Sequence, residues 1–197
     1  MPAKLDTHSS PLYQNLLLSL LAGLAFYLAF LVNDLLGSAI LYDNWIALFF
    51  LPAGIKHLFL LTTRGWGALG CFVGLLVPSL QFWTDTPVYQ VVLYCGLSTL
   101  ASWLGIELGV QLLGIRRDLH NLKFLHLPVL DLITTAVHGF MVNAYFLVVG
   151  MTSDHLLANS LAMMFGDFTG SFAVLACLWL ALHWIKYKNH TTNVNKL

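Results

Sequence analysis

Long apolar runs separated by short polar stretches form the main pattern of the chain. A helix needs about 17 or more apolar residues to cross the ~30 Å hydrocarbon core of a bilayer, and six runs reach that length. The predicted spans are 12–32, 45–61, 66–83, 88–114, 127–150 and 156–184. They form one domain, 12–185, between tails of residues 1–11 and 186–197. The pattern predicts an all-α membrane protein, a six-helix transmembrane bundle.

The second predicted span is the least regular of the six. Its sequence, WIALFFLPAGIKHLFLL, contains Pro52, Gly54 and Lys56 within a run close to the minimum crossing length. Proline removes a backbone donor and glycine loosens a helix, so we expect this span to be kinked or broken at Pro52-Gly54. A break at membrane depth is tolerated only where protein or a wet cavity satisfies the freed backbone groups. The segment is therefore expected to face the interior of the bundle.

The composition supports a membrane protein. Apolar residues make up 58% of the chain and charged residues 9%, with a mean hydropathy of +0.78. An average soluble domain carries about 25% charged residues. Because six spans use most of the 197 residues, we expect any catalytic output domain to belong to another chain.

Basic residues outside the predicted spans are distributed unevenly between the two sides of the membrane. Every lysine and arginine outside the predicted spans lies in one set of loops and tails: Lys4, Arg64, Arg116, Arg117, Lys123, Lys186, Lys188 and Lys196. The opposite loops carry Asp34, Asp43, Asp85 and Asp154. Since basic residues near span ends are retained on the cytoplasmic side, both termini are predicted to be cytoplasmic. The basic face suits the anionic headgroups of the lipid bilayer, and nucleic acid is not expected as a partner.

Five ionisable residues inside the predicted spans are candidates for a polar site: Lys56, Glu107, Asp131, His138 and Asp167. A charge at the bilayer centre costs about 2.5–3.5 kcal/mol on insertion scales, so each residue needs a partner or a wet cavity. Asp131 and His138 are seven residues apart and share one stripe of a helix. We predict that Lys56 pairs with Asp167, and that His138 forms a titratable cluster beside them with Asp131 and Glu107.

Structural alternatives apply to each of these residues. Lys56 and Asp167 could form a closed ion pair without a ligand as readily as a binding site. Asp131 and Glu107 are near span ends, where charged side chains snorkel to the interface. His57 and His138 are more typical of hydrogen-bonded packing residues than of haem or metal ligands. The sequence therefore predicts no metal site and names no cofactor.

No motif indicates catalysis. Ser98, Ser102, Ser160 and Ser171 lack the glycine-flanked context of a serine nucleophile, and the chain has no H-E-x-x-H sequence. We therefore predict that the protein is not an enzyme.

Two stretches resemble a known family. LPAGIKHLFLLTTRGWGALGCFVGLLVPS and FGDFTGSFAVL resemble the signatures of the bacterial membrane-associated sensor domain, which precedes histidine kinases and cyclic-di-GMP enzymes. Its motif positions correspond here to Pro52, Gly54, Gly166, Asp167 and Gly170. The resemblance implies a sensory module in the bacterial inner membrane. Two features depart from that family: Lys56-His57 replaces apolar positions, and the family usually has more spans and a fused output domain.

The leading functional hypothesis is a non-enzymatic module that senses or binds a small molecule and acts through a membrane or cytoplasmic protein partner. Lys56, His138 and Asp167 would line its site. An alternative is the substrate-binding subunit of a vitamin-like transporter, driven by a partner ATPase. A third is a haem-binding subunit that uses His57 and His138.

Overall fold

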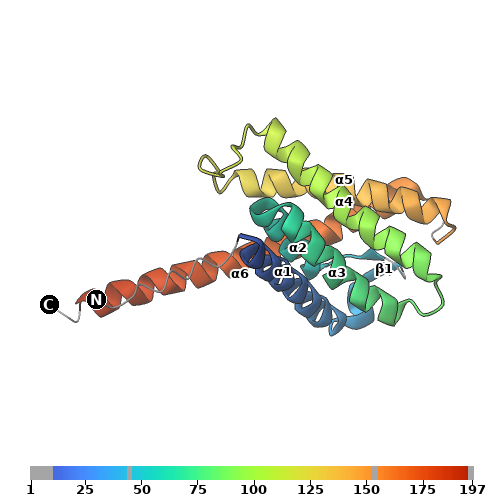
Figure 1. The fold of residues 1–197 in the computed structure, drawn as a ribbon, viewed down its shortest axis with the longest axis horizontal. Helices are drawn as coiled ribbons and strands as arrows, with labels where there is room; N and C mark the ends of the chain where they lie inside the picture. Colours follow the sequence, from blue (N-terminus) through green and yellow to red (C-terminus); the bar gives the residue numbers. More distant parts are fainter. Residues whose placement is uncertain (1–10, 44–45, 152–154, 195–197) are drawn as a thin grey trace.

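The computed structural model describes residues 11–43, 46–151 and 155–194 and shows an all-α fold (Figure 1). The α-helices are α1 (Pro11–Asp34), α2 (Leu51–Thr63), α3 (Gly65–Phe82), α4 (Val88–Leu112), α5 (His126–Val148) and α6 (Leu156–Val194). A 3₁₀ turn, η1 (Gly37–Ile40), and two short strands, β1 (Leu41–Asp43) and β2 (Ile46–Ala47), join α1 to α2. The predicted all-α class is confirmed.

The helices run back and forth between two ends of the bundle (Figure 1). One end contains the α2–α3 turn and the α4–α5 loop, and Arg64 of the turn donates an Nη2 hydrogen bond to the Arg117 carbonyl at 3.4 Å. We call it the basic end. The other end contains the strands and the α3–α4 connection, with Asp34 at the end of α1 and Asp85 in the α3–α4 connection. We call it the acidic end.

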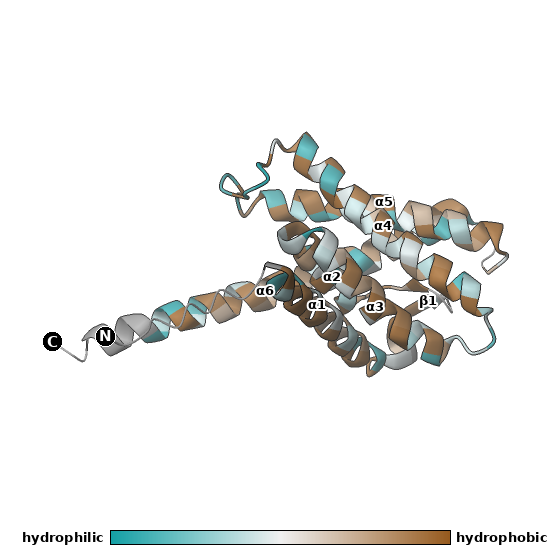
Figure 2. Cartoon of the chain, in the orientation of Figure 1, coloured by the Kyte–Doolittle hydropathy of each residue, from teal (hydrophilic) through white to brown (hydrophobic). Residues whose placement is uncertain are grey.

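Five helices are long and apolar enough to cross a membrane: Leu12–Asp34 of α1, Gly65–Phe82, Val88–Leu112, His126–Val148 and Leu156–Lys188 of α6. Much of the helical ribbon in Figure 2 has the brown colour of hydrophobic residues. Many large apolar side chains of these helices are exposed, with Leu20 and Phe172 both at least 60% exposed. Exposed apolar side chains in this number suit contact with lipid rather than water. The chain is a multi-pass helical membrane protein.

The second crossing differs from the predicted one. The α2 helix has 13 residues, which at 1.5 Å each gives about 20 Å, less than the bilayer core. Residues 46–50, expected to be helical, form β2 and an extended segment instead. The break therefore precedes Pro52, which lies in the first turn of α2. Proline is favoured there because its missing N–H would have no partner within the helix.

The extended segment is held by hydrogen bonds to neighbouring helices. Phe50 donates its N–H to the Gly166 carbonyl of α6 at 3.0 Å. Leu51 donates its N–H to Oδ1 of Asn33, at the end of α1, at 2.9 Å. These bonds satisfy the backbone groups that a helix break leaves free at membrane depth. The expectation that this segment faces protein is confirmed.

Glycines of α6 allow the extended segment to approach closely. A Cβ on Gly166 would collide with the Ala47 carbonyl, and one on Gly170 with the Phe50 carbonyl. On the α2 side, a Cβ on Gly54 would lie 2.7 Å from an α6 backbone atom. The two stretches that carry the family resemblance thus pack directly on each other.

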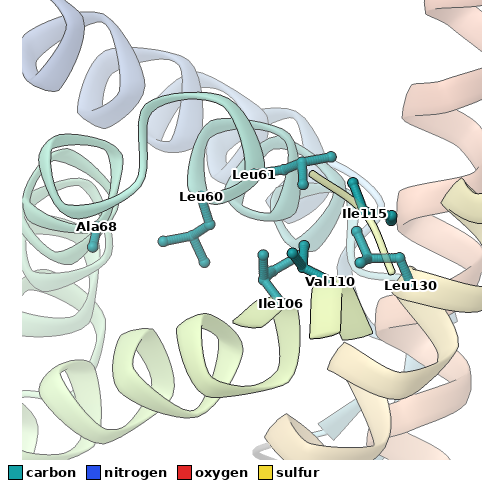
Figure 3. Close-up of a cluster of buried hydrophobic side chains, with 7 residues drawn as sticks. All are labelled: Leu60, Leu61, Ala68, Ile106, Val110, Ile115 and Leu130. Atoms are coloured by element: carbon teal, nitrogen blue, oxygen red, sulfur yellow. The ribbon is translucent and has the colours of Figure 1, made fainter. Parts of the chain in front are cut away.

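An apolar cluster closes the basic end. Figure 3 shows leucines of α2 facing residues of α4 and α5. The buried members are Leu60, Leu61, Ala68, Ile106, Val110, Ile115 and Leu130. These side chains pack between α2, α4 and α5 at that end.

The predicted tails differ in outcome. The tail predicted for 1–11 falls outside the described residues except for Pro11, which begins α1. Residues of the tail predicted from 186 continue α6 as one helix to Val194, which extends out of the bundle at the basic end (Figure 1).

Candidate functional site

Lys56, His138 and Asp167 meet in the interior, contributed by α2, α5 and α6. All three are at most 3% exposed. Lys56 Nζ lies 3.3 Å from Nε2 of His138, and Nδ1 of the same ring lies 2.5 Å from Oδ2 of Asp167. A neutral imidazole can accept a hydrogen bond from the ammonium at Nε2 and donate Nδ1–H to the carboxylate. The two charges therefore compensate each other through His138.

This arrangement modifies the predicted ion pair. Lys56 and Asp167 belong to one cluster, as expected, but the described structure has no direct ion pair between them because the His138 ring lies between. The arrangement makes physical sense, because a buried charge without a hydrogen-bonded partner would cost several kcal/mol.

Ser98 of α4 completes the cluster. Its Oγ lies 2.8 Å from His138 Nε2 and accepts a hydrogen bond from Lys56 Nζ at 3.3 Å. The Ser98–His138 and His138–Asp167 distances match those between a serine nucleophile and its base, and between that base and an orienting acid. Two features differ from such a triad. The Lys56 ammonium competes for Nε2, and Ser98 is 1% exposed and lines no described cavity.

A second histidine–carboxylate pair lies closer to the basic end. His57 Nδ1 is 2.6 Å from Oδ1 of Asp131 and 3.3 Å from Oγ of Ser171. The predicted contact of Asp131 with His138 is wrong, because seven residues of helix separate them by about 10 Å. The snorkelling alternative for Asp131 also fails, since the residue is 5% exposed. Within the described residues, Nε2 of His57 has no hydrogen-bond partner.

Glu107 does not join either pair. It is half-buried and forms no hydrogen bond or ion pair in the described part of the chain. Helix geometry explains the failure of this prediction. Gly105 and Gly109 face α5 in the packed interface, and Glu107, two residues from each, is rotated about 200° away from them.

A cavity of about 390 Å³ leads to the first cluster from the acidic end. It extends from exposed residues, including Asp34 and Gly37, down to the buried side chains of His138 and Asp167. Five aromatic residues form much of its wall: Phe30, Phe50, Phe82, Trp83 and Tyr94. A mostly apolar pocket of about 300–1,000 Å³ with a few convergent polar groups is typical of small-molecule sites.

The second cavity, next to the His57–Asp131 pair, is far smaller. The cavity beside His57 and Asp131 measures about 40 Å³, and its other walls include Leu58, Leu61 and Leu130. That volume holds water molecules but is much too small for a haem. Both ring nitrogens of His138 are already hydrogen-bonded. The geometry therefore disfavours the haem hypothesis, and the site opens toward the acidic end.

Sequence reasoning missed two parts of this site. Asn33 holds the first turn of α2, and its only signal was a polar residue at the end of the first apolar run. The sequence presents Ser98 only as one of several serines that lack a nucleophile motif. Its burial at a polar cluster depends on which face of α4 meets α2 and α5, which one sequence does not specify.

Comparisons with models of protein families, with curated proteins and with solved structures found no match. The functional interpretation therefore rests on the cavity and its residues.

Proposed function

We propose that this chain is a non-enzymatic membrane module that binds a small molecule in the cavity of the acidic end and acts through a protein partner. The observation that carries the proposal is the cavity itself. Its floor is formed by His138 and Asp167, the two residues that connect to the buried Lys56. The charge distribution supports an extracytoplasmic opening, since the basic end is expected in the cytoplasm.

The cluster provides a physical route from the cavity to the helices. A ligand that hydrogen-bonds to Asp167 or His138 competes with their mutual bond and so changes the partners of Lys56. Lys56 lies on α2, which is short and joined to the strands by an extended segment. Asp167 lies on α6, which continues out of the bundle to Val194. A shift of either helix would reach the basic end, where a partner can detect it.

The family resemblance agrees with this proposal. The two stretches that carry it pack on each other around the extended segment, and Asp167, one of its motif positions, is at the cavity floor. The proposed partner is accordingly a kinase or a cyclic-di-GMP enzyme in the bacterial inner membrane.

Transport remains the second candidate. Discontinuous crossings beside a central site are common in transporters, and β2 with α2 forms such a crossing. In that case the protein would be the substrate-binding subunit of a vitamin-like transporter.

A cavity-filling variant tests ligand binding. The low-molecular-weight fraction of a cell extract is added to purified protein, and its melting temperature is measured. We expect wild type to be stabilised and Ala47→Phe, which fills the cavity, to lose the effect. Leu48→Phe is the matched control, because Leu48 is the next residue, is 38% exposed and does not line the cavity. Equal stabilisation of both variants would contradict cavity binding.

Co-purification from native membranes separates the two candidate functions. Recovery of a histidine kinase or a diguanylate cyclase with the tagged protein supports sensing. Recovery of ATPase subunits, with uptake of a vitamin into cells, supports transport and rejects sensing.

A further inference from the structure

We propose that the cavity of the acidic end selects an organic cation, a small molecule with an amine or quaternary ammonium group on an apolar body. This inference rests on the proposed function, because it names the chemical class of ligand for the same cavity. It is carried by the composition of the cavity wall, the position of the carboxylates and the charge of the surrounding loops.

The wall provides aromatic surfaces suited to a cation. The rings of Trp83 and Tyr94 are 4.6 Å apart between centroids, and those of Phe30 and Phe82 are 5.7 Å apart. Phe50 lies next to Phe30, at 6.5 Å. The face of an aromatic ring carries a negative quadrupole, which attracts ammonium groups within about 6 Å of the centroid. An apolar ligand body is accommodated by the same rings.

Carboxylates lie at both ends of the cavity. Asp34 is exposed near its mouth, and Asp167 is buried at its floor. The described lining contains no lysine or arginine. Lys56 is behind His138, outside the lining, and its charge is compensated by Asp167. Asp34 has no ion pair within the described residues, so the cavity carries a net negative charge.

The loops of the acidic end extend this negative field. Asp34 at the end of α1 and Asp85 in the α3–α4 connection are exposed, and the connections 35–50 and 83–87 contain no lysine or arginine in the sequence. Clefts lined by one sign of charge concentrate ligands of the opposite sign. An anionic ligand would approach against this field and would meet the Asp167 carboxylate, so the electrostatics discriminate against it.

Three probes of similar size test the class of ligand: benzyltrimethylammonium, the neutral N-benzylacetamide and the anionic phenylacetate. Binding to the full chain in lipid nanodiscs is measured by titration calorimetry, with empty nanodiscs subtracted. We expect benzyltrimethylammonium to bind at least tenfold more tightly than either other probe. Asp34→Asn and Trp83→Leu should each weaken its binding about fivefold or more.

Asp85→Asn is the matched control, since Asp85 is an exposed aspartate of the same end that does not line the cavity. Its affinity should remain within twofold of wild type, and an equal loss in Asp34→Asn and Asp85→Asn would overturn a specific site. Tighter binding of phenylacetate or N-benzylacetamide that is lost in Ala47→Phe would overturn the cation class while leaving the proposed function intact. No binding of any probe overturns the cation proposal, and the proposed function fails as well only if the cell-extract fraction also stabilises nothing.

Discussion

The imidazole of His138 lies between Asp167 and Lys56. Its Nδ1 is 2.5 Å from Oδ2 of Asp167, and its Nε2 is 3.3 Å from Nζ of Lys56. Hydrogen bonds through the ring therefore connect the buried Lys56 ammonium to the buried Asp167 carboxylate. Because Asp167 and His138 also line the cavity, any molecule that enters competes for the hydrogen bonds that keep Lys56 compensated. If the proposed ligand binding is correct, this imidazole couples the bound molecule to the buried ionic cluster.

Removing the negative charge from this cluster should destabilise the protein. Asp167→Asn leaves the Lys56 ammonium buried without a counter-charge, and breaking a buried pair on one side typically costs about 3–5 kcal/mol. Lys56→Met in the same chain should recover much of that loss, because it removes the uncompensated cation. The measurement is the free energy of unfolding in mixed micelles for both single variants and the double variant.

Asp118→Asn is the control for this cycle. Asp118 pairs with Arg116 at 3.0 Å, but both side chains are more than half exposed, so the change should cost less than about 1 kcal/mol. Strictly additive effects of Asp167→Asn and Lys56→Met would show that the two charges are independent.

The sequence predicted the parts of this arrangement that depend on hydropathy. Lys56, His138 and Asp167 were expected in one cluster because lipid rejects charge, and all three are buried together. The bridging role of His138 and the pairing of Asp131 with His57 were not predictable. They depend on the rotation and depth of α2 relative to α5, which are determined by packing between helices.

The second crossing shows a similar limit. Pro52 and Gly54 indicated a break, but a proline is compatible with an internal kink or with the first turn of a helix. The choice depends on Asn33, which binds the Leu51 N–H, and on Gly166, whose carbonyl accepts from Phe50. These contacts are distant in sequence, so local propensity did not reveal them.

Adding a methyl group at Gly170 should disrupt the packing of α6 on the extended segment. In Gly170→Ala the new Cβ collides with backbone atoms of Phe50 and Leu51, which cannot move away as a flexible side chain would. Overpacking of this kind costs about 1–3 kcal/mol or more. The free energy of unfolding measures the effect.

Gly96→Ala provides the comparison, because Gly96 lies within α4 and a Cβ there meets no atom within 4 Å. That variant should be neutral or more stable by up to about 1 kcal/mol. If both alanines have the same effect, the close approach at Gly170 is not structurally important.

Asn33 should be needed for the start of α2. Asn33→Ala removes the acceptor for the Leu51 N–H, and a buried donor left unsatisfied costs about 1–3 kcal/mol. Hydrogen exchange at the Leu51 amide should accelerate at the same time. Asn33→Asp keeps an acceptor oxygen and should preserve protection of that amide; equal loss of protection in both variants would argue against this role.

Ser98 should be chemically inert despite its short distance to His138. A fluorophosphonate probe labels serines that are both activated and accessible, and the described structure offers Ser98 no access from the cavity. We expect wild type and Ser98→Ala to give the same background labelling, with a soluble serine hydrolase as the positive control. Labelling of wild type that disappears in Ser98→Ala would make the protein an enzyme.

We predict that the acidic end faces the outside of the cell and the basic end faces the cytoplasm. The α2 helix covers about 20 Å, yet with β2 and residues 48–50 it must carry the chain from the acidic end to Arg64 at the basic end. In a variant with Cys71, Cys95 and Cys177 replaced by alanine, a single cysteine at Asp85 should react with a membrane-impermeant maleimide on intact cells. One at Asp118, in the α4–α5 loop, should react only after lysis, because basic loops stay in the cytoplasm. Labelling of Asp118→Cys on intact cells with protection of Asp85→Cys would mean that the charge rule fails for this chain, and the cavity could not then be assigned to the outer face.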